Sequence, residues 1–256
     1  MYTFEVLFRV DGAVTEDVVV AASSLLSAWY KSGQICAPTW PLAKVSEGLK
    51  AFVSTPAADA LDPDHANRYV RDAAATLATR FGAVVEQLLL GHDPESAPEC
   101  VCEARAGYIL FTHYLTVESP LRCADCFLPL PLYAASPPRD FEHLDVITWA
   151  DDYKACDTLQ MNTAVGERFG ENQLGQFDSA LSRKGHETCR RLAEVLGKPV
   201  YYYLHRARGR SVTSERERRC PNCNQAWLLA QRLHRRFDFQ CDNCHLLSNI
   251  ASSLGT

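Results

Sequence analysis

Apolar and polar positions in the first ninety residues predict alternating strands and helices. Residues 4–10 (FEVLFRV) and 48–55 (GLKAFVST) have the composition of strands, and a weaker strand is expected near 40–45. Residues 83–91 (AVVEQLLLG) form a nearly continuous apolar run, which is typical of a buried strand.

Two helices are expected between these strands. The first begins after the capping residue Thr15 and stops at Gly33, and the second opens at Asp62 and Pro63 and ends at Gly82. Each carries an apolar stripe at helical spacing: Val18, Ala22, Leu25 and Trp29 in the first, and Ala66, Tyr69, Val70, Ala73, Leu77 and Phe81 in the second. The order strand, helix, two strands, helix, strand predicts a ferredoxin-like α/β sandwich.

The rest of the chain is less periodic. A polar linker at 91–99 leads into a β-rich run, and a Pro-rich connector covers 129–140. A helix is predicted over 182–196, capped by Ser182, and a strand follows at 200–206. The predicted fold class is therefore α+β. Its three parts are a ferredoxin-like domain at 1–96, a central region with zinc knuckles and a helix at 97–205, and an Arg-rich arm with a zinc ribbon at 206–256.

Two C-x-x-C pairs near the C-terminus have the spacing of a metal site. Cys220 and Cys223 form one pair, and Cys241 and Cys244 form the other. Four thiolates are the closed tetrahedral ligand set of structural zinc, whereas a catalytic zinc keeps one position open. Iron in a rubredoxin-like site is the main alternative, because its ligands are also four thiolates.

The segment between these pairs favours a ribbon. Phe237 and Phe239 alternate with Asp238 and Gln240, as in a half-buried strand. The stretch AWLLAQRLHRR at 226–236 is compatible with either a strand or a short helix. A module of about fifty residues has too small a core to fold alone, so metal binding and folding are expected to be coupled.

A second four-cysteine set lies in the central region, where Cys100-x-Cys102 is followed by Cys123-x-x-Cys126. This set predicts a second zinc site, for a total of two zinc ions. His113 or His92 could replace one thiol as a ligand, and the alternative is that these are ordinary core cysteines.

We expect a cytoplasmic protein from the sequence. Hydrophobic residues make up 47% of the 256 residues, which is enough for a real core. No apolar run approaches a membrane span, and the start MYTFEVLFRV lacks the pattern of a signal peptide. The eleven cysteines are therefore expected to be reduced or metal-bound.

The net charge of -5 conceals a basic segment. Residues 205–236 contain nine arginines and two glutamates, a formal +7, so the remainder carries -12. Planar guanidinium groups suit phosphates and stack on bases. The candidate contacts to RNA or DNA are Arg216, Arg218, Arg219, Arg235, Arg236 and Trp227. The alternative is a solvated or protein-facing basic surface.

No catalytic motif is evident, so the protein is predicted not to be an enzyme. The sequence has no Gly-rich phosphate loop, no G-x-S-x-G and no H-E-x-x-H. His186 and Cys189 share a helix face, but Cys189 fits the apolar stripe and no third group orients the pair. Asp151 and Asp152 are more typical of a solvated loop than of an acid–base pair.

The C-terminal motifs resemble a known family. The segments KPVYYYLHRARGRSVTSERERRCPNCNQAW and FDFQCDNCHLLSN resemble an uncharacterised bacterial family described as zinc-ribbon-containing and as a candidate for nucleic-acid binding. The resemblance implies metal ligands at Cys220, Cys223, Cys241 and Cys244, and it implies no catalytic residues.

Two classes of function follow. The first is a zinc protein that binds RNA or DNA through its ribbon and arginines, mostly at phosphates. The second is an adaptor whose zinc sites are scaffolds and whose arginines dock an acidic protein partner. An enzyme whose site is invisible in the sequence is a third and weaker class.

Overall fold

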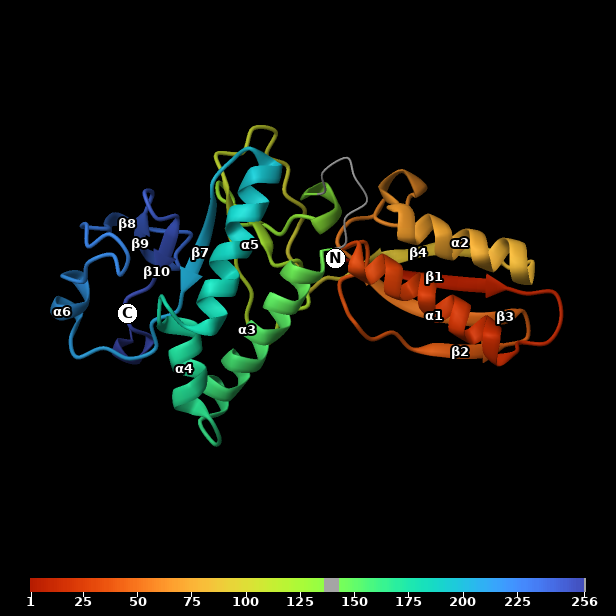
Figure 1. The fold of residues 1–256 in the computed structure, drawn as a ribbon, viewed down its shortest axis with the longest axis horizontal. Helices are drawn as coiled ribbons and strands as arrows, with labels where there is room; N and C mark the ends of the chain where they lie inside the picture. Colours follow the sequence, from red (N-terminus) through yellow and green to blue (C-terminus); the bar gives the residue numbers. More distant parts are fainter. Residues whose placement is uncertain (136–142, 256) are drawn as a thin grey trace. The chain divides into compact units, whose positions relative to one another are not determined.

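The chain is divided into two compact units, which are described separately. A computed structural model describes residues 1–135 and 143–255 (Figure 1). The N-terminal unit comprises Met1–Cys100, Val117–Ser119 and Leu128–Leu144, and the C-terminal unit comprises Val101–Thr116, Pro120–Phe127 and Asp145–Thr256. The predicted Pro-rich connector at 129–140 lies partly outside the described residues.

The N-terminal unit contains a four-stranded antiparallel sheet in the order β2-β3-β1-β4. Its elements are β1 (Tyr2–Arg9), α1 (Glu16–Lys31), β2 (Leu42–Val45), β3 (Gly48–Thr55), a 3-10 turn (Pro63–His65), α2 (Arg68–Phe81), β4 (Val84–His92) and a second 3-10 turn (Leu132–Ala135). The predicted order of strands and helices is therefore observed.

Alternating side chains of the sheet build the core of this unit. Phe4, Val6 and Phe8 of β1 are buried, as are the corresponding apolar residues of β3, and both helices contribute to the same cluster. In a strand, every second side chain points to the same face. The helices therefore cover the face to which these residues point.

The start of α2 differs from the prediction. Asp62 and Pro63 open only the short 3-10 turn, and α2 begins later, after Asn67. The Asn67 side chain accepts a hydrogen bond from the Val70 N–H at 3.0 Å. A side-chain oxygen at this position satisfies one of the free N–H groups of the first helical turn, and Asn67 is therefore the cap.

β4 was predicted to be buried, and this prediction is wrong. Leu88 and Leu90 are 57% and 50% exposed, and most of the strand is exposed with them. The run is apolar, but β4 is an edge strand with β1 as its single neighbour in the sheet. Composition indicates that a segment prefers burial, whereas the sheet order decides how much cover it receives.

The C-terminal unit is built on a six-stranded mixed sheet in the order β6-β5-β7-β10-β9-β8. Its strands are β5 (Tyr108–Leu110), β6 (Leu121–Cys123), β7 (Val200–Leu204), β8 (Leu228–Leu233), β9 (Phe237–Cys241) and β10 (Leu246–Ser248). Its helices are α3 (Leu144–Asn162), α4 (Glu167–Gly175), α5 (Ala180–Leu196) and α6 (Val212–Arg216), and a 3-10 turn (Ser252–Leu254) lies near the end.

β7 joins two hairpins that are far apart in the sequence. It pairs in parallel with β5 on one side and with β10 on the other, and the outer pairs β5–β6, β10–β9 and β9–β8 are antiparallel. Both cysteine-bearing regions therefore contribute strands to one sheet.

Helices α3 and α5 lie along β7 (Figure 1). Trp149 of α3 and Tyr202 of β7 are completely buried, with ring centroids 5.9 Å apart. α5 approaches them at Gly185, where a Cβ atom would lie 2.0 Å from the Tyr202 ring. The absence of a side chain at this position allows the close approach.

Three local features of the structure were not predicted, or were predicted differently, from the sequence. The 19-residue α3 was not predicted: Val146, Trp149, Tyr153 and Cys156 form a buried stripe, but apolar residues also occur on its exposed side, which blurs the pattern. The cap of α5 is Ser179, whose hydroxyl accepts from the Ser182 N–H at 3.0 Å, so the predicted cap Ser182 lies inside the helix. The ambiguous stretch at 226–236 is a strand, β8.

Replacing Gly185 with alanine should destabilise the C-terminal unit by about 1–3 kcal/mol, because the added methyl group overpacks against Tyr202 and Trp149. In a helix with free space at this position, glycine to alanine increases the free energy of unfolding by up to ~1 kcal/mol. The sign of the measured change therefore shows whether Gly185 is tightly packed. The measurement is urea unfolding followed by tryptophan fluorescence. Glu187→Ala, at an exposed position of α5, is the control. Equal or greater stability of Gly185→Ala would contradict the packing described here.

Candidate metal centres and the arginine arm

The two C-terminal C-x-x-C pairs converge on one point. The sulfur atoms of Cys220, Cys223, Cys241 and Cys244 all lie within 4.8 Å of one another, and those of Cys223 and Cys241 are 3.5 Å apart. A tetrahedron of thiolates about 2.3 Å from a zinc ion has edges of roughly 3.8 Å. The four sulfurs therefore fit a tetrahedral metal ion.

The surroundings of these thiols differ. A hydrogen bond from the backbone of Gln225 lowers the pKa of Cys223 to about 7, while burial raises the pKa of Cys241 well above its ordinary value. The Asn222 side chain donates to the sulfur of Cys244 at 3.4 Å. Backbone and side-chain donors at the sulfurs are the arrangement that stabilises thiolates bound to a metal.

The central cysteines form a second group of the same kind. The sulfurs of Cys100, Cys102, Cys123 and Cys126 also lie within 4.8 Å of one another. Neither His92 nor His113 belongs to this group, so the structure favours four thiols over a histidine ligand. Two four-thiol groups could thus hold two metal ions, as expected for two zinc ions.

The C-x-x-C turns of the two groups share a backbone feature. The residue after each second cysteine has a positive φ: Phe127 at 64°, Asn224 at 58° and His245 at 50°. The N–H of Phe127 donates to the carbonyl of Cys123, and that of Asn224 donates to the carbonyl of Cys220, both at 2.9 Å. Left-handed conformations are uncommon outside glycine, so their recurrence marks these turns as equivalent knuckles.

One hairpin reaches the knuckle of the other group. His234, in the turn between β8 and β9, donates from Nε2 to the carbonyl of Ala124 at 2.7 Å. Its ring stacks on Phe127 at 5.2 Å between centroids. These contacts couple the two cysteine regions in addition to the shared sheet.

Part of the basic segment is neutralised within the fold. Arg206 and Arg218 both pair with Glu215, whose side chain is 2% exposed, and Arg232 pairs with Asp238 at 2.8 Å. Arg208 pairs with Glu167 and Glu171 of α4. Among the described residues, five arginines of the segment are exposed and have no carboxylate partner: Arg210, Arg216, Arg219, Arg235 and Arg236.

Two of the predicted nucleic-acid contacts, Trp227 and Arg218, make contacts within the fold. Trp227 is 3% exposed and donates from its indole nitrogen to the carbonyl of Arg218 at 3.1 Å. The guanidinium of Arg218 lies over the Phe239 ring at 4.4 Å and donates to the carbonyl of Asn249 at 2.8 Å. Trp227 is therefore a core residue of the C-terminal unit, and the partly buried Arg218 packs beside it. The sequence could not distinguish this from exposure.

The considered Cys–His pair does not have the character of a nucleophilic pair. Burial lowers the pKa of His186 to about 4 and raises the pKa of Cys189 far above its ordinary value. A thiolate–imidazolium pair requires the opposite shifts. Asp152 is paired with Lys184 at 2.8 Å, and both it and Asp151 are exposed on α3 rather than on a loop.

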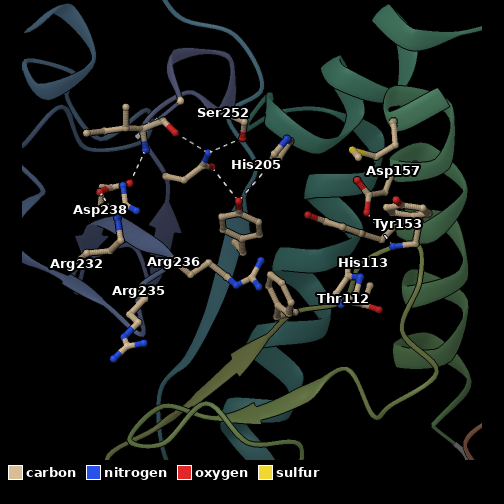
Figure 2. A pocket seen from close by; sticks show the side chains of 17 residues that line it. Thr112, His113, Tyr153, Asp157, His205, Arg232, Arg235, Arg236, Asp238 and Ser252 are labelled. Carbon is tan, nitrogen blue, oxygen red and sulfur yellow. Dashed lines mark hydrogen bonds and ion pairs between the residues drawn. The ribbon is translucent and has the colours of Figure 1, made fainter. Parts of the chain in front are cut away.

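A cavity of about 530 Å³ in the C-terminal unit was not anticipated (Figure 2). It brings together polar groups from distant segments, among them His113, Asp157, His205 and Arg236. No local spacing links these residues, so no pattern in the sequence could have revealed them.

The fold and site define a two-unit α+β protein with two four-cysteine groups. Three family profiles match successive parts of the chain: Domain of unknown function (DUF8589) at residues 1–89, Domain of unknown function (DUF2310) at 102–205, and Domain of unknown function (DUF8594) at 209–254. Within the described residues, no helix has both the length and the apolar character needed to cross a membrane.

Two relatives in Haemophilus influenzae, both uncharacterised proteins, are similar to this chain. One is 33% identical over 260 residues, covering 98% of each chain, and the other is 35% identical over 163 residues, covering 64% of this chain and 80% of the relative. The chain therefore belongs to the family of these uncharacterised bacterial proteins. No solved structure matches it significantly.

The purified protein should contain close to two zinc ions per chain. Cys223→Ser and Cys102→Ser should each remove one, because each takes one ligand from a different group. Cys36→Ser, at a cysteine outside both groups, should leave both ions in place. Elemental analysis with native mass spectrometry measures the count. At most one metal ion, together with native alkylation of Cys100 and Cys102, would contradict the second site.

Replacing Glu215 with glutamine should destabilise the C-terminal unit by about 3 kcal/mol, because it leaves the partly buried Arg218 without its carboxylate. Glu217→Gln, two residues away and exposed, should change stability by less than about 0.5 kcal/mol. Urea unfolding at constant zinc measures both. Equal stability of the two variants would show that the Glu215 pairs contribute nothing.

Proposed function

We propose that this protein is a non-enzymatic, cytoplasmic zinc-binding protein that binds single-stranded nucleic acid through exposed arginines of its C-terminal unit. The observation that carries the proposal is the set of five exposed arginines without a carboxylate partner among the described residues. Surface arginines in ordinary basic surfaces are often compensated by neighbouring acids. Uncompensated guanidinium groups attract phosphates and release counterions when they bind.

The fold assignments belong to the same proposal. A ferredoxin-like N-terminal unit is supported by the strand order β2-β3-β1-β4 with antiparallel neighbours and two helices on one face. A zinc ribbon at the C-terminus is supported by the knuckles at Cys220–Cys223 and Cys241–Cys244, which flank the hairpin β8–β9.

The two zinc ions would have structural roles. Cys220, Cys223, Cys241 and Cys244 would hold one ion, and the central four cysteines would hold the other. A bound zinc ion supplies a rigid fourfold cross-link, and four thiolates leave it no open position for a substrate. Its task here is to fix the turns from which the arginines project.

Binding through these arginines would be mostly electrostatic. The five side chains are spread from Arg210 to Arg236, so they would follow a flexible backbone better than a single base edge. Phosphate contacts give affinity without sequence discrimination. With Trp227 buried in the ribbon, base stacking by this residue is not part of the proposal.

A protein-binding adaptor is the second candidate, and one observation favours it. The edge strand β4 exposes Val84, Leu88, Leu89 and Leu90 by 43–57%. Exposed apolar edge strands pair readily with a strand of another protein. In this case the arginines would serve to attract an acidic partner.

The salt dependence of binding to a short oligonucleotide tests the first candidate. Each phosphate contact contributes about 0.7 to the slope of log affinity against log salt for single strands. Arg216→Ala combined with Arg219→Ala should therefore reduce the slope by about 1.4 and weaken different sequences similarly. Fluorescence anisotropy over a salt series, with RNA and DNA strands, is the measurement.

A matched pair of exposed arginines provides the control. Arg168→Ala combined with Arg183→Ala removes the same charge from α4 and α5 of the C-terminal unit and should leave the slope unchanged. An equal effect of the two double variants would show that binding depends on the net charge of the protein and not on these particular arginines. If the zinc-loaded protein binds neither RNA nor DNA at low salt, the adaptor becomes the better explanation.

A further inference from the structure

The cavity of the C-terminal unit has the composition of a ligand site. Its volume of about 530 Å³ is far larger than a phosphate ion and lies within the ~300–1,000 Å³ typical of small-molecule sites. It is formed by the residues after β5, by α3, by β7, by the hairpin of β8 and β9, and by residues after β10 (Figure 2).

Arg236 is one of the charged groups that line this cavity. Its guanidinium lies over the Phe111 ring at 4.8 Å and near the Phe127 ring at 5.8 Å. Figure 2 shows the side chain directed into the cavity, whereas that of its neighbour Arg235 points away. Stacking occupies the faces of a guanidinium and leaves its in-plane N–H groups available.

The charge of Arg236 is not compensated among the described residues, where it has no ion pair. Arg232, which also lines the cavity, donates to Asp238 at 2.8 Å, and the other oxygen of Asp238 accepts from the Ile250 N–H at 2.7 Å. The nearby acid is thus already engaged, and an anionic ligand would be the partner of Arg236.

Further hydrogen-bonding groups line the cavity wall. The hydroxyl of Thr112 is completely buried and has no hydrogen-bond partner among the described residues. A buried polar group without a partner costs free energy, which is recovered when a ligand supplies one. Burial also lowers the pKa of His205, whose Nδ1 lies 3.1 Å from the Tyr203 hydroxyl, so its ring stays neutral near pH 7.

Asp157 adds a carboxylate to the cavity lining. One of its oxygens accepts from the Tyr114 N–H at 2.9 Å, and the residue lies on α3 beside Tyr153 (Figure 2). A carboxylate repels phosphate but accepts hydrogen bonds from sugar hydroxyls. A ligand that fits both ends therefore carries an anion for Arg236, hydroxyl groups for Asp157 and a flat body for the aromatic wall.

We propose that this cavity binds a nucleoside monophosphate, with Arg236 on the phosphate and Asp157 on the sugar. This inference rests in part on the proposed binding of nucleic acid, because the same chemical group occurs as a free nucleotide and as the phosphorylated end of a strand. The cavity would then recognise a terminal nucleotide, while the other four exposed arginines hold the phosphates that follow it.

The direct test is calorimetric titration of the zinc-loaded full-length protein with adenosine 5′-monophosphate, adenosine and inorganic phosphate. The nucleotide should bind more tightly than either fragment, because only it contacts both ends of the cavity. Arg236→Gln should weaken the nucleotide about tenfold or more, as expected for losing a charge-assisted hydrogen bond. Asp157→Asn should affect the nucleotide and adenosine but leave inorganic phosphate nearly unchanged.

Arg168→Gln, which removes an equal charge from α4 outside the cavity, is the matched control and should bind the nucleotide like the unmodified protein. Each variant is compared at equal zinc content and equal melting temperature, so that misfolding is recognised. The absence of nucleotide binding at millimolar concentration, or equal effects of Arg236→Gln and Arg168→Gln, would overturn the proposal.

A second arm distinguishes the two sources of the ligand and separates this proposal from the preceding one. If the cavity holds a strand end, a 5′-phosphorylated oligonucleotide should bind about tenfold more tightly than its 5′-hydroxyl counterpart, and Arg236→Gln should abolish the difference. Mononucleotide binding without this preference would assign the cavity to free nucleotides. Strand binding that is independent of the end phosphate, with no mononucleotide binding, would overturn the cavity site and leave the function proposed above intact.

Discussion

Mutual repulsion of thiolates is the constraint that both four-cysteine groups of the chain impose. Four sulfur atoms within 4.8 Å of one another cannot all ionise unless a cation lies among them, and the chain creates this situation twice. One group includes Cys123 at the end of β6, and the other includes Cys241 at the end of β9. A metal ion held by either group would therefore cross-link one of the outer hairpins of the sheet.

Much of the local structure could be predicted from the sequence, because it is governed by local chemistry. Periodicity and capping residues located α1, β3 and the end of α2 at Gly82, and cysteine spacing located both thiol groups. The buried stripe of α3 is hard to recognise in the sequence, because apolar residues such as Leu144 and Met161 also occur on its exposed side. The exposure of β4 depends on sheet order, which is a property of the whole unit.

The candidate binding residues also show which properties follow from local sequence and which depend on the tertiary fold. A count of charges in the sequence identified the basic segment, but it gave Arg218 and Arg219 equal weight. In the fold, Arg218 is held by Glu215 and stacked on Phe239, while Arg219 is exposed. Pairing between residues distant in space decides which charge remains available to a ligand, and the cavity around Arg236 arises in the same way.

The mixed sheet also has a consequence for the order of folding. β7 must pair with β5, about ninety residues earlier in the chain, and with β10, more than forty residues later. Such non-local pairings close large loops and form slowly. During synthesis the hairpin β5–β6 emerges before the strands that complete the sheet. A metal ion in the central cysteine group would stabilise this hairpin until those strands are available. The sheet is completed only after β8, β9 and β10 have been synthesised, and until then β7 has an open edge.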